Sequence, residues 1–214
     1  MKPLFYYILA SFVIFSHNAN ATTFATNNCM GKKLAVFGDS LVAGYGLEPG
    51  FAFPEQLDKK LDELGIKIDV INAGISGDTT SGGLARLDWS VGGEINGVIL
   101  ELGANDALRG ISPEITEKNL DVMISKFKEK NIEVLLAGMM APPNMGSTFG
   151  KSFNGIYPKL AKMHEISLYP FFLEGVAANP KLNQQDGIHP TKEGIAIIVD
   201  KTMPSILEFL KKVC

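Results

Sequence analysis

Five short segments that read as strands alternate with longer helical patterns along this chain, and the alternation restricts the possible folds more than any other feature. These segments lie at 34–37, 67–71, 97–102, 133–138 and 168–173. Between the first two, apolar residues recur with the spacing of one helix face: Phe53, Leu57, Leu61 and Leu64. Alternating strands and helices fold as α/β proteins. We therefore expect a three-layer α/β/α sandwich with a five-stranded parallel sheet and a flavodoxin-like strand order.

Ordinary start and stop signals bound the helical segments. Pro113 after Ser112 marks the start of one helix, because proline suits the first helical turn. A looser helical pattern over 152–164 is interrupted near Pro158, and a last helix is expected over 191–213. No repeat, low-complexity segment or linker separates these patterns, so we expect a single domain.

The first residues have the layout of a secretory signal peptide. Lys2 precedes an apolar run at 4–15, and small residues at 19–21 provide a cleavage site. The run is shorter than the roughly 20 apolar residues that a transmembrane helix needs, and an uncleaved anchor is the competing interpretation. We expect a signal peptide at 1–21, one domain at 22–214, and a periplasmic or secreted protein.

Composition narrows the range of partners. Of the 214 residues, 46% are hydrophobic and 20% are charged, and the net charge at pH 7 is −3. A mildly acidic chain without basic clusters is poorly suited to binding nucleic acid. No segment after the first run is long and apolar enough to cross a membrane. We expect a monomer that acts on a small molecule.

Two cysteines, Cys29 and Cys214, lie near the ends of the mature chain. Cys29 precedes the first expected strand and Cys214 ends the last expected helix, which places both at the amino-terminal edge of the sheet. In an oxidising compartment they can pair, and the alternative is two free thiols on frayed ends. Their spacing offers no zinc site, and we expect no metal.

Polar or glycine-rich turns follow three of the expected strands. They are Gly38-Asp39-Ser40, Ser76-Gly77-Asp78 and Gly103-Ala104-Asn105-Asp106. In open α/β folds the carboxyl ends of the strands form the ligand crevice. A serine at a helix start in that crevice suits a nucleophile, because helix-start amides attract negative charge. Each turn taken alone also fits an ordinary structural turn.

A fourth polar segment, Asp186-Gly187-Ile188-His189-Pro190, lies near the carboxyl end. A carboxylate three residues before a histidine can accept the imidazole Nδ1–H. The other ring nitrogen is then free to act as a base in the crevice. A single Asp-x-x-His motif is more often part of an ordinary turn, so its significance as a catalytic pair depends on the three turns upstream.

These four blocks, in this order, resemble those of the SGNH (GDSL) hydrolases. The longer strings NAGISGDTTSGGLARL, ELGANDALRG, IYPKLAK and DGIHP resemble the bacterial thioesterase I, lysophospholipase and arylesterase branch. The resemblance extends from about 34 to 194. The chain lacks Gly-x-Ser-x-Gly around Ser40, which argues against the α/β-hydrolase family.

The resemblance implies a serine esterase that needs no cofactor or metal. Ser40 is expected to be the nucleophile, His189 the general base and acid, and Asp186 the residue that orients the imidazole. The oxyanion hole is expected to comprise the Ser40 and Gly77 backbone N–H groups and the Asn105 side-chain amide.

The resemblance also places two loops, 107–113 and 140–146, along an acyl groove. From them we take Leu108, Ile111, Met140 and Pro142 as candidate substrate-binding residues, with core packing as the alternative. Methionine would make an adaptable apolar wall for acyl chains. The expected substrates are acyl esters, thioesters or lysophospholipids.

Three other functions stay open. The same fold and triad support a carbohydrate O-acetyl esterase, although few aromatics accompany the site blocks. A non-catalytic binding domain is possible in principle, and a flavodoxin-type protein would be yellow when purified.

Several polar and aromatic residues near the blocks are expected to serve structure instead of chemistry. Asp39 and Asp106 should stabilise their turns, and Arg109 should form a surface salt bridge. Trp89 should serve packing, and His164 should be solvated or structural.

Overall fold

The computed structural model describes residues 29–91 and 94–214, and the predicted signal peptide at 1–21 lies outside this part of the chain. One parallel sheet runs through the molecule in the order β2-β1-β3-β4-β5. Its strands are β1 (Lys33–Gly38), β2 (Asp69–Gly74), β3 (Gly97–Glu101), β4 (Glu133–Ala137) and β5 (Ser167–Tyr169). The predicted α/β fold and the flavodoxin-like strand order are both confirmed.

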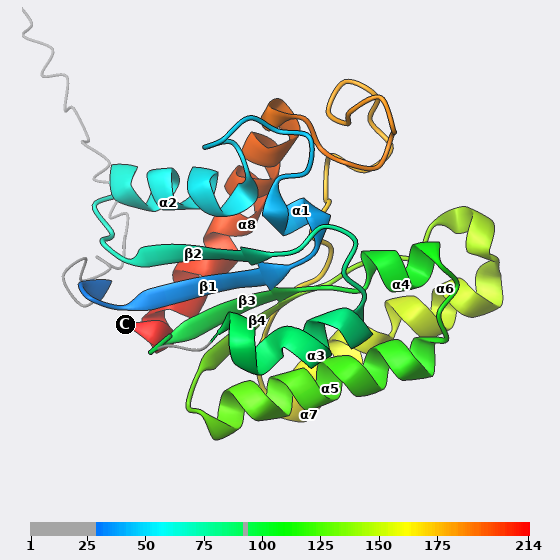
Figure 1. The fold of residues 1–214 in the computed structure, drawn as a ribbon, viewed down its shortest axis with the longest axis horizontal. Helices are drawn as coiled ribbons and strands as arrows, with labels where there is room; N and C mark the ends of the chain where they lie inside the picture. The colour runs from blue at the N-terminus through cyan, green and yellow to red at the C-terminus, as the bar shows by residue number, and fades with distance from the viewer. Residues whose placement is uncertain (1–28, 92–93) are drawn as a thin grey trace, which may run out of the picture.

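Helices cover both faces of this sheet (Figure 1). The longer ones are α2 (Phe53–Glu63), α3 (Thr80–Ser90), α5 (Pro113–Glu129), α7 (Ile156–His164) and α8 (Lys192–Val213). Helices α2 and α8 contact each other on one face, and α5 contacts α3 and α7 on the other. The shorter helices are α1 (Ser40–Ala43), α4 (Ala104–Leu108), η2 (Pro143–Met145) and α6 (Ser147–Asn154). The predicted three layers are therefore confirmed.

The two edge strands differ most from the sequence prediction. Strand β2 begins two residues later than expected and extends to Gly74, because its parallel register pairs Lys33 with Asp69 and Gly38 with Gly74. Its side chains are only partly buried, so its apolar pattern is weak. Strand β5 is only three residues long. The next residue, Pro170, has no N–H to donate to a ladder, which agrees with this early end.

Two details of the helices also differ from prediction. The break in the 152–164 pattern lies at Gly155, and Pro158 is the third residue of α7, where its missing N–H has no intrahelical partner to lose. Trp89 is 81% exposed, so its predicted packing role is wrong. The buried stripe of α3 is Thr80, Gly83 and Leu87, and Trp89 falls on the opposite side of that helix.

The two ends of the described chain meet at the amino-terminal edge of the sheet. Cys29, just before β1, and Cys214, just after α8, form a disulfide with their Cα atoms 4.7 Å apart. In Figure 1 the C-terminus lies beside the start of β1. Among the helices described, none combines the length and apolar character that crossing a membrane requires.

Candidate active site

The nucleophile candidate Ser40 begins α1, directly beyond the carboxyl end of β1. The chain turns there at Gly38, where a Cβ would approach the Glu101 carbonyl oxygen to 2.6 Å, so only glycine fits. Asp39 caps α1, since its Oδ1 accepts a hydrogen bond from the Leu41 N–H at 3.0 Å. The turn and its cap thus place Ser40 at the crevice edge of the sheet.

Ser40, His189 and Asp186 are joined in one chain of hydrogen bonds. His189 Nε2 lies 2.9 Å from Ser40 Oγ, and His189 Nδ1 lies 2.7 Å from Asp186 Oδ2. The other Asp186 oxygen accepts the backbone N–H groups of Ile188 and His189, at 2.9 and 3.0 Å. These bonds from His189 and Ile188 lower the pKa of Asp186 to about 2, so its carboxylate stays ionised. This is the geometry in which imidazole activates a serine.

Two residues whose contacts the sequence did not predict, Tyr45 and Gln184, surround the His189 segment. The Tyr45 ring lies against the imidazole, with centroids 4.5 Å apart. The Gln184 side-chain amide donates to the carbonyls of Tyr45 and Pro190, at 2.8 and 3.0 Å, and the Gln184 N–H donates to the His189 carbonyl at 2.7 Å. Gln184 therefore ties the Tyr45 loop to the histidine segment. No local pattern signals a contact between residues 139 positions apart.

The two remaining oxyanion-hole candidates are both held by other site residues. Gly77 has φ = +85°, a backbone conformation that favours glycine, and its carbonyl accepts a hydrogen bond from Arg109 Nη2 at 2.9 Å. Asn105 lies in the first turn of α4, and its Nδ2 donates to Asp39 Oδ2 at 3.0 Å. Arg109 thus holds the Gly77 peptide, and the predicted surface salt bridge is not its contact. Asp39 supports both the turn and Asn105.

A model of the GDSL-like lipase/acylhydrolase family matches residues 36–197, which include every one of these site residues. The chain belongs to this family. The resemblance that the four sequence blocks indicated is confirmed.

Relatives in the family are esterases by name. The chain is 41% identical to an arylesterase of Vibrio mimicus over 180 residues, 84% of this chain and 90% of that protein. It is 42% identical to thioesterase 1/protease 1/lysophospholipase L1 of Escherichia coli strain K12, over 78% of this chain and 79% of that protein. The crystal structure of AlinE4, an SGNH-hydrolase family esterase, is 42% identical and matches with a TM-score of 0.71, covering 83% of this chain and 95% of AlinE4. The chain is therefore an ester hydrolase with the SGNH-hydrolase fold.

Two buried carboxyl groups lie beneath the nucleophile candidate Ser40 of this GDSL-family esterase. Asp39 and Glu101 are both fully buried, and the Asp39 N–H points at Glu101 Oε2, 3.4 Å away. Burial raises the pKa of Asp39 to about 6. Burial, and then the negative charge of Asp39, raise the pKa of Glu101 well above its usual range. Because two adjacent buried carboxylates cannot both ionise cheaply, Glu101 is the member of the pair that holds its proton more strongly.

Replacing Glu101 by glutamine should therefore make stability less sensitive to pH. In the wild type, the unfolded state releases the Glu101 proton above about pH 4.5 while the native state keeps it. The free energy of unfolding then falls with rising pH, up to the raised native pKa. Glutamine does not titrate, so the Glu101→Gln variant lacks this contribution to the pH dependence. Urea unfolding at pH 5 and pH 8 should show the Glu101→Gln variant gaining on the wild type at the higher pH. Glu133→Gln, at an exposed position, is the control. If Glu101→Gln and the wild type differ by the same free energy of unfolding at pH 5 and at pH 8, the raised pKa of Glu101 is contradicted.

The candidate substrate-binding residues, here called the rim, are apolar and at least partly exposed. Among the four substrate-binding candidates, Leu108 is 47% and Met140 51% exposed, and Ile111 and Pro142 are half-buried. Two further exposed apolar side chains, Ile75 and Ile188, lie next to predicted site residues in the sequence and were not among the candidates. Both could have been found from the sequence, because each is an apolar residue within two positions of a predicted site residue. The neighbouring Met139, in contrast, belongs to the core.

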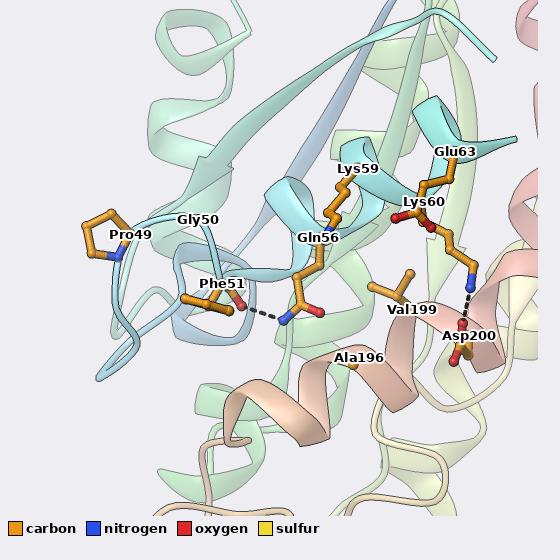
Figure 2. A pocket seen from close by; sticks show the side chains of 10 residues that line it. All are labelled: Pro49, Gly50, Phe51, Gln56, Lys59, Lys60, Glu63, Ala196, Val199 and Asp200. Carbon is orange, nitrogen blue, oxygen red and sulfur yellow. Dashed lines mark hydrogen bonds and ion pairs between the residues drawn. The ribbon is translucent and has the colours of Figure 1, made fainter. Parts of the chain in front are cut away.

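A separate hollow of about 400 Å³ lies between α2 and α8 (Figure 2). The Lys60–Asp200 salt bridge, at 2.8 Å, crosses it, and the Gln56 amide donates to the Phe51 carbonyl at its other end. None of the site residues lines this hollow. Without a nucleophile beside a base, it offers no place for ester hydrolysis.

Proposed function

We propose that this chain is a secreted serine esterase that hydrolyses fatty-acyl esters through an acyl-enzyme. The observation that carries the proposal is the hydrogen-bond chain from Ser40 through His189 to Asp186 at the carboxyl edge of the sheet. In the first half of the reaction, Ser40 Oγ attacks the acyl carbonyl carbon while His189 Nε2 accepts the hydroxyl proton. His189 then gives that proton to the oxygen or sulfur of the leaving group.

The oxyanion of the tetrahedral intermediate is stabilised by three N–H donors. They are the backbone N–H groups of Ser40 and Gly77 and the side-chain amide of Asn105. One Asn105 N–H is held by Asp39, which leaves the second for the oxyanion. In the second half, His189 takes a proton from water, the water oxygen attacks the acyl carbon, and Ser40 regains its proton as the fatty acid leaves.

The rim supports an acyl chain as the preferred substrate group. Leu108 and Met140 present exposed apolar side chains, and Met140 can adapt its shape to chains of different length. Stacking surface for sugar rings is sparse, since Tyr45 already contacts the His189 ring. The alternative of a carbohydrate O-acetyl esterase is therefore the weaker one.

Secretion is supported by two features. The sequence begins with the layout of a signal peptide at 1–21, and the structure contains a disulfide between Cys29 and Cys214. Disulfides persist in oxidising compartments outside the cytosol. A lipid ester such as a lysophospholipid is accessible there, and cytosolic acyl-CoA is not.

A series of para-nitrophenyl esters from acetyl to palmitoyl tests the proposal. We expect kcat/KM to rise from acetyl toward medium or long chains, because each methylene buried on the apolar rim contributes roughly 0.8 kcal/mol at most. Acid-quenched samples should contain a Ser40 peptide heavier by the acyl group. Preference for acetyl would favour the carbohydrate esterase, and inactivity on every ester would contradict the proposed function.

A further inference from the structure

Arg86 is a nearly buried cation that the proposed reaction does not use. It projects from α3 with only 11% of its side chain exposed, and it forms an ion pair with Asp78, Nε to Oδ2 2.5 Å. Its guanidinium carbon lies 3.9 Å from the centre of the Phe37 ring. Burying an ion pair of this kind is costly and is not by itself a source of stability. The partners of the remaining guanidinium N–H groups indicate a different role.

Two of those partners are backbone carbonyls of the two segments that lead to the proposed nucleophile and to Gly77. Arg86 Nη2 donates to the Gly38 carbonyl at 2.9 Å, two residues before Ser40. Arg86 Nη1 donates to the Ala73 carbonyl at 3.0 Å and to Ser90 Oγ at 2.9 Å. One rigid guanidinium therefore spans the carboxyl ends of β1 and β2, which lie side by side in the sheet (Figure 1).

The Gly38–Asp39 peptide is held from both sides. Its carbonyl accepts from Arg86 and from the Ile75 N–H, the latter at 3.0 Å, and its N–H faces Glu101. Because a peptide unit is planar, fixing its carbonyl also fixes the direction of its N–H. The chain therefore leaves β1 toward Ser40 along a fixed path.

The segment 75–78, which contains Gly77, is also held at both of its ends. Its first residue, Ile75, donates to the Gly38 carbonyl, and the Asp78 N–H returns to the Ile75 carbonyl at 3.1 Å. The Asp78 carboxylate is bound to Arg86. Gly77 thus lies inside a closed turn whose exit is attached to the guanidinium that also holds the Gly38 carbonyl.

We propose that Arg86 is the positioning residue of the oxyanion hole, fixing the Gly77 N–H relative to the Ser40 N–H. This inference rests on the proposed roles of Ser40 and Gly77. Arg86 touches no substrate and acts through the backbone of both turns. Oxyanion donors stabilise the transition state only when they are aimed at the developing charge, and a misplacement of about 1 Å can cost on the order of 10²-fold in rate.

The test replaces Arg86 by lysine, which keeps the charge but loses the planar set of donors. With para-nitrophenyl octanoate, kcat should fall about 10- to 100-fold while KM stays near the wild-type value. Binding of octanoate, the product, should be unchanged. An octyl trifluoromethyl ketone should bind more weakly by the same factor as kcat, because Ser40 Oγ adds to its carbonyl carbon and the resulting oxyanion needs the aligned donors.

Asp88→Asn is the matched control, because it removes a charged partner from the same helix as Arg86 but away from the site. Asp88 is exposed and pairs with Lys126 and Lys130, each at 2.8 Å. We expect its kcat to equal the wild-type value. If Arg86→Lys does not fold, Asp78→Asn replaces it, since this variant weakens only the link to the Gly77 turn.

Three outcomes would overturn the inference. The first is full kcat in Arg86→Lys, or in Asp78→Asn when it is used instead. The second is a loss of kcat with unchanged affinity for the trifluoromethyl ketone, which assigns Arg86 to fold stability alone. The third is an inert wild type on every ester, which overturns the proposed function and this inference with it. The first two require an active wild type and are therefore distinguishable from the third.

Discussion

Replacing Ser40 by alanine should reduce ester hydrolysis on the order of 10⁴- to 10⁶-fold. In the proposed mechanism His189 Nε2 activates the Ser40 hydroxyl, whose Oγ lies 2.9 Å away, and alanine has no group that could form the acyl-enzyme. The remaining activity would come from the oxyanion donors acting on water. The comparison is kcat of the wild type and of Ser40→Ala on the best ester of the para-nitrophenyl series.

Two further variants separate chemistry from stability. Ser152→Ala removes an exposed hydroxyl on α6 and should retain wild-type activity and melting temperature. The double variant Ser40→Ala/His189→Ala should be no slower than Ser40→Ala alone, because the two residues act as one unit. Hydrolysis by Ser40→Ala at the wild-type rate would mean that another group is the nucleophile.

The sequence was most informative where structure is determined locally. The runs that form β1, β3 and β4 are nearly continuous apolar segments, as strands buried on both faces must be. The edge strand β2 is half-exposed and has no such run, so its bounds were misplaced. Trp89 was misjudged for a related reason, since residue type alone does not say which side of α3 faces the core.

The candidate site shows the same difference between local contacts, which could be predicted, and contacts with distant segments, which could not. Asp186 and His189 are three residues apart, so their hydrogen bond follows from local geometry and could be predicted. Arg86 and Arg109 bind backbone carbonyls of other segments, and no side-chain pattern encodes such partners. Glu101 lies within an apolar run and was read as a strand residue, although a carboxyl group in a buried strand was itself a signal.

Removing the disulfide should lower the free energy of unfolding on the order of 5 kcal/mol, because the cross-link restricts the unfolded chain and its contribution grows with loop length. Cys29 and Cys214 are 185 residues apart, so the unfolded ensemble of almost the whole domain is constrained. Urea unfolding of Cys29→Ala/Cys214→Ala against the oxidised wild type measures the difference, and the reduced wild type should resemble the variant.

The effect of the disulfide should appear in stability and not in catalysis. Cys29 precedes β1 and Cys214 follows α8, whereas Ser40 begins α1 beyond the carboxyl end of β1. In Figure 1 the C-terminus and α1 lie at opposite ends of β1. At a temperature where all proteins are folded, kcat should therefore equal the wild-type value. Cys214→Ala is the sharper single variant, because Cys29 is fully buried and its truncation adds a cavity cost. Two free thiols in the denatured, unreduced protein, or equal stability of variant and wild type, would contradict this role.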